Sequence, residues 1–142
     1  MTFRTVNPES LGAPKGFSHG VLASGRGRLL FVAGQPGWDA SAGAASAAPE
    51  FAEQFALALD RVLAVVRTAG GSANDVARLT VYVVDLEAYR AARPKLADAW
   101  RQRFGTYYPA MALLEVKGLV DAGALVEIEA TAVLEGESSH AD

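Results

Sequence analysis

Apolar residues at the spacing of a helix predict the first of two helices. Between positions 51 and 66 they recur every three or four residues, which places them on one face, and Gly70-Gly71 follows as a stop signal. The second helix should end at Phe104, and Asp85 is placed to cap its first turn. Pro94 should start or kink the main part of this helix, because proline has no backbone N–H to donate.

Five shorter stretches rich in Val, Leu, Ile and Thr predict strands. They cover residues 17–24, 28–33, 75–84, 108–116 and 125–134. Gly25-Arg26-Gly27 indicates that the first two form a hairpin, and Asp121-Ala122-Gly123 indicates that the last two are paired. Gly34-Gln35-Pro36-Gly37 should end the second strand, and residues 38–48 should form a loop.

This order of elements predicts one α+β domain at residues 1–134, followed by a polar tail at residues 135–142. Both helices should cover the same face of a mixed β-sheet. We expect the other face to be partly apolar, with little in the chain to cover it. We therefore expect the protein to self-associate.

Composition narrows the function. The 142 residues have a formal net charge of −3 and a pI near 5.4, which disfavours a nucleic-acid-binding surface. No apolar run approaches the roughly 18 residues of a membrane span, and the N-terminus has no secretory core, so we expect a cytoplasmic protein. With two histidines and no cysteines, we expect neither a metal site nor thiolate chemistry.

The last predicted strand contains two carboxylates. Glu127 and Glu129 alternate with Val126 and Ile128, so they share one face. Glutamates beside aliphatic surface mark either the solvated side of a sheet or the wall of a cleft. The pattern alone leaves both interpretations open.

Several motifs, in their order and spacing, resemble those of one family. They are Gly16-Phe17-Ser18-His19-Gly20-Val21, Phe31-Val32-Ala33-Gly34-Gln35, Leu79-Thr80-Val81-Tyr82-Val83, Pro109-Ala110 and Val126-Glu127-Ile128-Glu129-Ala130. Together they run nearly the whole length of the chain. The chain resembles the Rid family of imine and enamine deaminases, also called the L-PSP endoribonuclease family.

The resemblance implies a chorismate-mutase-like (bacillus-type) α+β fold, with sheets that close into a barrel in a homotrimer and a cleft between subunits. Catalytic members hydrolyse small imines, such as those derived from 2-aminoacrylate, without metal or cofactor. In them an arginine directly after the Pro-Ala pair holds the substrate carboxylate. A glutamate at the position of Glu127 positions the attacking water, and a tyrosine and a serine line the pocket.

This chain departs from that pattern. Met111, Phe17 and Ala33 stand where the family has the arginine, the tyrosine and the serine, and only Glu127 is retained. A thioether cannot imitate the bidentate grip of a guanidinium on a carboxylate, and losing such an anchor costs roughly 2–5 kcal/mol. We therefore expect an apolar ligand site whose ligand carries no negative charge. Tyr108 either lines its mouth or packs in the core or an interface.

Another cation could take the place of the missing arginine. Lys117 lies six residues along the same strand from Met111, which is about 20 Å, so it cannot replace the arginine within one subunit. Arg26 or Arg28 from a neighbouring subunit is an alternative. A solvent-exposed turn is the simpler place for both.

These residues favour a cofactor-free hydrolase that acts on small imines or enamines. Glu127 would hold the water, and His19, on the same face as Phe17, would assist as a proton carrier. A structural histidine at a subunit interface is the alternative for His19. A trimer that binds a small ligand without catalysis is the alternative for the whole protein, and RNA cleavage is disfavoured.

Overall fold

The computed structural model describes residues 2–38 and 48–136. Its strands are β1 (Thr2–Val6), β2 (Gly20–Ser24), β3 (Gly27–Pro36), β4 (Val76–Val83), β5 (Ala110–Glu115) and β6 (Val126–Glu135). The helices are α1 (Phe51–Thr68) and α2 (Leu86–Phe104), with short 3-10 turns η1 (Glu9–Leu11) and η3 (Ala73–Asp75). Most of the predicted loop, 39–47, and most of the predicted tail, 137–142, lie outside the described residues. Glu135, predicted to begin the tail, still belongs to β6.

Helix α1 forms as its periodicity predicts. The apolar positions on its predicted face are all buried, together with Gln54; they are Phe51, Phe55, Ala58, Leu59, Val62, Leu63 and Val66. After the last turn, Gly70 has a φ of 93°, which suits glycine. The N–H groups of Gly70 and Gly71 donate to the carbonyls of Arg67 and Val66, both at 2.9 Å. This is the Schellman arrangement, and it confirms the predicted stop.

Helix α2 begins at the predicted cap. The Asp85 carboxylate accepts hydrogen bonds from the N–H groups of Glu87 at 2.9 Å and Ala88 at 3.2 Å. The helix ends at Phe104, and Gly105 follows with a φ of 61°. Pro94 lies inside the helix and does not start it.

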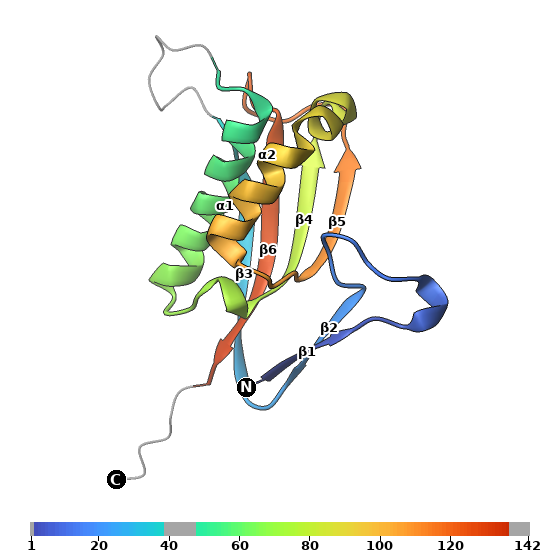
Figure 1. Cartoon of the computed structure of the whole chain (residues 1–142). Coiled ribbons are helices and arrows are strands. Elements are labelled where there is room, and N and C mark those ends of the chain that lie inside the picture. The colour runs from blue at the N-terminus through green and yellow to red at the C-terminus, as the bar shows by residue number, and fades with distance from the viewer. Residues whose placement is uncertain (1, 39–47, 137–142) are drawn as a thin grey trace.

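Figure 1 shows both helices on the same face of one sheet, as predicted, with the β1–β2 pair set apart from it. The four strands of that sheet run in the order β3-β6-β4-β5. The pair β4–β5 is parallel and the other two pairs are antiparallel, so the sheet is mixed. A parallel pair needs a long crossover, which α2 supplies.

The predicted pairing of the last two strands is wrong. β5 pairs only with β4 in this sheet, and β6 lies between β3 and β4. The connecting segment passes the end of β4, where Val116 N–H donates to Val83 O at 2.8 Å and Val84 N–H donates to Leu125 O at 3.2 Å. A turn sequence shows that the chain bends, but it does not determine which strand edge it reaches.

The predicted hairpin of the strands at residues 17–24 and 28–33 is also wrong. The chain does turn at Gly25, which has a φ of 102°. However, β2 pairs antiparallel with β1, and β3 pairs antiparallel with β6. The sequence does not predict β1, and this strand pairs with the edge of β2 where β3 was expected.

Strand β3 runs further than predicted. It continues through Gly34 and Gln35 to Pro36. The register shifts between Val32 and Gln35, so Ala33 and Gly34 together oppose Glu129 in a β-bulge. Pro36 is tolerated because β3 is an edge strand, where a missing N–H need not break the ladder.

The two faces of the sheet differ. Alternate residues of β6 pack under the helices, and Val126, Ile128 and Ala132 are fully buried. On the opposite face, which we call the open face, Leu29 is 64% exposed and Phe31 is 75% exposed in the single chain. In the described part of the chain, neither helix is both long and apolar enough to cross a membrane.

Candidate functional site

Glu127 lies on the open face. It is level with Tyr82 of β4 in the strand register, and Glu129 is level with Thr80. Both glutamates are partly exposed, while Val126 and Ile128 between them are buried. The prediction that the two carboxylates share a face is confirmed.

The bulge of β3 makes room for the Glu127 carboxylate. A Cβ atom added to Gly34 would overlap Glu127 Oε1 and lie only 3.0 Å from its Cδ. The neighbouring Ala33 is exposed. The structure therefore brings Ala33 and Glu127, two of the predicted site residues, to the same place. Bulges of this kind are common beside functional sites.

Glu129 has a different environment. Its Oε1 accepts a hydrogen bond from the Tyr82 hydroxyl at 2.7 Å. That hydrogen bond to a carboxylate is the main reason why the pKa of Tyr82 is raised above its usual value, and burial and the charges of Glu129 and Glu127 add to it. A hollow of about 290 Å³ lies beside this pair, with Phe31, Arg78 and Thr131 in its wall.

Met111 lies on the other face of the sheet. It is level with Leu79, which is fully buried under the helices. Within one chain, Met111 and Glu127 are therefore separated by the sheet itself. If the two act on one ligand, they must come from different copies of the chain.

Met111 lines a cavity of about 190 Å³ between α2 and strands β4 and β5, which we call the α2 pocket. Tyr108, Leu113 and Trp100 also line it. The rings of Trp100 and Tyr108 are stacked, with centroids 5.5 Å apart and an interplanar angle of 3°. The structure thus places the predicted ligand-binding residues Tyr108 and Met111 in one pocket with a largely apolar wall.

Arg93 also lines the α2 pocket and was missed in the sequence. Its Cζ lies 5.6 Å from the centroid of the Tyr89 ring, in a cation–π contact. The signal was available, because Tyr89, Arg93, Leu96 and Trp100 follow one another at helical spacing. The cations that the sequence suggested, Lys117, Arg26 and Arg28, lie on other segments of the chain.

The N-terminal segment holds the remaining predicted residues. Phe17 and His19 lie before β2, so their predicted place in a strand is wrong, but their rings are in contact edge to face with centroids 5.1 Å apart. His19 Nε2 lies 3.2 Å from Gly12 O and donates to it, and its backbone N–H donates to Asn7 Oδ1 at 2.8 Å. These hydrogen bonds hold His19 against Asn7 and Gly12 of the same N-terminal segment.

Ser18, between them, anchors this segment to β5. It is 5% exposed, and its hydroxyl donates to Tyr108 O at 2.6 Å. Its N–H donates to Pro109 O at 3.0 Å, and it bridges to Ala110. Gly16, just before Phe17, lines the α2 pocket, but Phe17 itself is not among the residues that line it.

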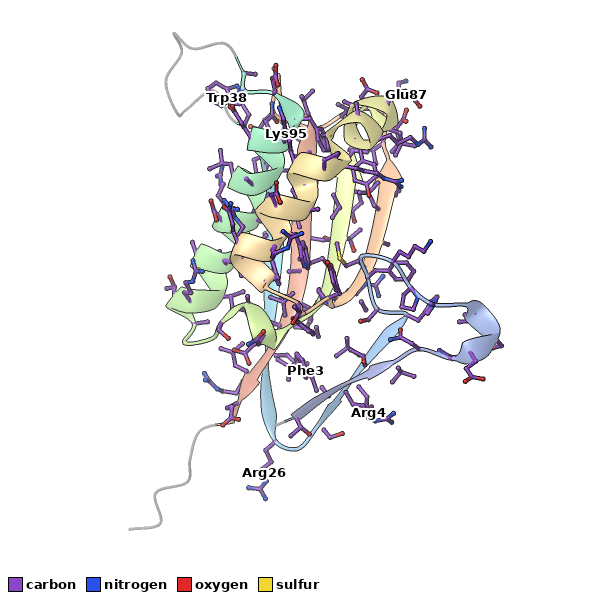
Figure 2. All side chains as sticks on the ribbon, in the orientation of Figure 1. Phe3, Arg4, Arg26, Trp38, Glu87 and Lys95 are labelled. Carbon is purple, nitrogen blue, oxygen red and sulfur yellow. The ribbon has the colours of Figure 1, made fainter. Side chains whose placement is uncertain are left out.

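Two other cations lie away from the pocket. Figure 2 shows Arg26 at the turn between β2 and β3, pointing away from the rest of the chain. Arg28 Nε donates to Glu135 O at 3.0 Å, at the far end of β6. Across residues 2–38 and 48–136, no group of three or more potential metal-ligating side chains comes together.

Comparison with known proteins shows what this arrangement is similar to. A family model described as Endoribonuclease L-PSP matches residues 8–134. A RutC family protein of Pyrococcus horikoshii is 32% identical over 123 residues, which are 87% of this chain and 93% of that protein. A Rid family protein of unknown function from Yersinia pestis has a crystal structure that is similar with a TM-score of 0.78. It is 34% identical, and the match covers 94% of this chain and all of that chain (100%).

A second solved structure, RidA from an Antarctic Psychrobacter bacterium, matches with a TM-score of 0.61 and 26% identity. That match covers 87% of this chain and 92% of the other. The family match spans most of the chain, and the fold and relatives agree with it. The chain belongs to the Rid (L-PSP endoribonuclease) family.

Proposed function

We propose that this protein is a cytoplasmic, cofactor-independent hydrolase that acts on small imines or enamines. The observation that carries the proposal is the Glu127 carboxylate, which lies partly exposed against the Gly34 bulge in a Rid family chain. A carboxylate held in this way can orient a water molecule toward a ligand on the same face.

The reaction needs water, a group that accepts its proton and a group that gives a proton to the nitrogen. Glu127 accepts a proton from the water as its oxygen bonds to the imine carbon, and the C=N electron pair moves to nitrogen, which takes a proton. The resulting carbinolamine collapses to a carbonyl compound and releases ammonia. An enamine first takes a proton at carbon to become the imine. His19 is the candidate for the second proton transfer, because an imidazole ring can both donate and accept a proton.

We place the reaction between copies of the chain in a homotrimer. Glu127 and Met111 lie on opposite faces of the sheet, so one chain cannot present both to one small molecule. A neighbouring copy that packs its open face near the α2 pocket would complete the cleft. The exposed Leu29 and Phe31 support such packing.

The substrate should differ from the imines of 2-aminoacrylate. In those compounds the carboxylate is bonded to the reacting carbon, so its anchor must stand directly beside the chemistry. At that position this chain has Met111, which offers no donor. The site therefore suits imines with an apolar group at the reacting carbon.

Turnover of imines generated in the assay by an amine oxidase tests this proposal. We expect ammonia release from neutral imines to exceed the rate in buffer, and Glu127→Gln to lower the enzymatic rate by about 10²–10⁴-fold, as expected for loss of a general base. Glu53→Gln, on an exposed part of α1, is the matched control and should retain the wild-type rate. A wild-type rate equal to the rate in buffer would contradict the proposal.

A trimer that binds a ligand without catalysis is the second candidate. It is favoured by the apolar residues Phe17, Ala33 and Met111, which stand at three of the four positions that are polar in catalytic relatives. In that case Glu127→Gln would leave binding unchanged. RNA cleavage is disfavoured, because a net charge of −3 does not attract a polyanion.

A further inference from the structure

We propose that the α2 pocket binds an organic monocarboxylate with an apolar, ring-sized body, and that Arg93 holds its carboxylate. The inference rests on the proposed function in one respect, since it takes this pocket to be the apolar half of the substrate cleft. The sequence predicts a ligand without a negative charge. The pocket instead allows a carboxylate on the ligand, provided that this carboxylate lies away from the reacting carbon.

The shape and wall of the pocket suit a ring. Its volume is about 190 Å³. An apolar protein cavity of about 150 Å³ binds benzene, so a six-membered ring with a short substituent fits this volume. Trp100 and Tyr108 stack on each other and supply aromatic surface to the wall, and Met111 and Leu113 supply flexible and branched aliphatic surface.

Arg93 differs from the other arginines of α2 in its contacts. Arg90 pairs with Glu87 at 2.6 Å, and Arg101 pairs with Asp98 at 3.4 Å. Arg103 grips both oxygens of Asp60, at 2.7 and 3.0 Å. Among the described residues, the contact shown for Arg93 is the Tyr89 ring, and no carboxylate pairs with it. A guanidinium that lies against an aromatic ring keeps its in-plane N–H groups for a carboxylate.

The position of Arg93 also selects the length of the ligand. It approaches from the helix, whereas Met111 stands on the strand where catalytic relatives have their arginine. A carboxylate on Arg93 therefore needs an apolar spacer between it and the carbon that lies near Met111. This excludes the smallest substrates of the family and favours ring-bearing or longer-chain acids.

Isothermal titration calorimetry of the full-length protein tests the inference with two probes of the same shape, 3-phenylpropanoate and 3-phenylpropanamide. We expect the acid to bind at least tenfold more tightly than the amide, and to lose that advantage in Arg93→Gln and at high salt. Arg90→Gln, three residues away on the same helix and paired with Glu87, is the control and should keep it. Circular dichroism would establish that both variants are folded.

Each other outcome overturns the inference. Equal binding of acid and amide would show that Arg93 is not an anchor, and binding of neither would show that the pocket is not a site for this class. An acid preference that survives Arg93→Gln would place the anchor elsewhere. The proposed function is tested separately, because imine turnover and its loss in Glu127→Gln do not depend on which probe binds.

Discussion

Gly34 is the residue on which the geometry around Glu127 depends. The bulge lets two residues of β3 oppose one residue of β6, and the side of Gly34 that lacks a Cβ faces the carboxylate. Any larger residue would have to displace the end of the Glu127 side chain. That movement costs little stability, because the end of a glutamate side chain is flexible, but it moves the group that is to hold the water.

We therefore predict that Gly34→Ala separates activity from stability. Imine turnover should fall by about 10²-fold, as expected for a catalytic group misplaced by about 1 Å, while the free energy of unfolding changes by less than about 1 kcal/mol. Gly118→Ala is the control, because a Cβ there meets no atom within 4 Å. Steady-state kinetics and urea denaturation measure the two quantities. Unchanged turnover in Gly34→Ala would show that the Glu127 carboxylate does not need its present position.

Between elements, Tyr107 joins the end of α2 to the start of β4. Its hydroxyl donates to Val76 O at 2.6 Å, and its carbonyl accepts from Trp100 Nε1 at 3.1 Å. Burial, with a smaller contribution from the charge of Asp75, raises the pKa of Tyr107 from 10.0 to about 12. The neutral phenol is thus the form that the folded state prefers.

This shift predicts how stability responds to alkaline pH. In the unfolded chain Tyr107 loses its proton near pH 10.0, but in the folded chain it does so only near 12. The folded state then binds more protons, so its contribution to stability is complete below pH 10.0 and is lost as pH rises through about 12. Tyr107→Phe should cost about 1 kcal/mol at neutral pH and make the alkaline decline shallower.

Urea denaturation between pH 7 and pH 11.5 would measure this effect. Tyr108→Phe is the matched control, since that side chain stacks on Trp100 and its hydroxyl has no hydrogen-bond partner among the described residues. An alkaline decline of the same slope in Tyr107→Phe and in wild type would contradict the assignment.

At the scale of the whole molecule, the open face of the sheet carries apolar side chains that stay exposed in the single chain. Leu29 and Phe31 project from β3 on the side that the helices do not cover, next to the polar group of Arg78, Tyr82 and Glu129. An exposed apolar strip beside a polar one is typical of a surface that packs against another copy. In the proposed trimer this face also brings Glu127 to a neighbour.

A charge on this face should therefore break the assembly. We predict that the wild-type protein elutes as a trimer in size-exclusion chromatography with light scattering, and that Phe31→Asp elutes as a smaller species with little imine turnover. Val120→Asp is the control, because Val120 is 98% exposed on the connection between β5 and β6 and lies off the sheet. A wild-type monomer at micromolar concentration would contradict the proposed assembly, as would a Phe31→Asp trimer.

Much of the secondary structure was predictable because it depends on residues near one another in the chain. The spacing of apolar residues and the stop at Gly70-Gly71 determine α1 locally. Asp85, as a cap, determines where α2 begins. Alternation in β6 placed Glu127 and Glu129 on one face for the same reason. The predicted pairing of the strands was wrong. β6 lies between β3 and β4, and its contacts with both strands join residues that are distant in sequence.

The same division holds for the site. By itself, the sequence determined the family motifs, the retained Glu127 and the apolar residue at Met111, because these are identities at fixed spacings. Only the tertiary structure decided that Met111 and Glu127 lie on opposite faces, that Gly34 faces the carboxylate and that Arg93 shares a pocket with Met111. The physical reason is that strand order and helix docking are set by burial of the whole core, and this long-range packing chooses which distant side chains meet.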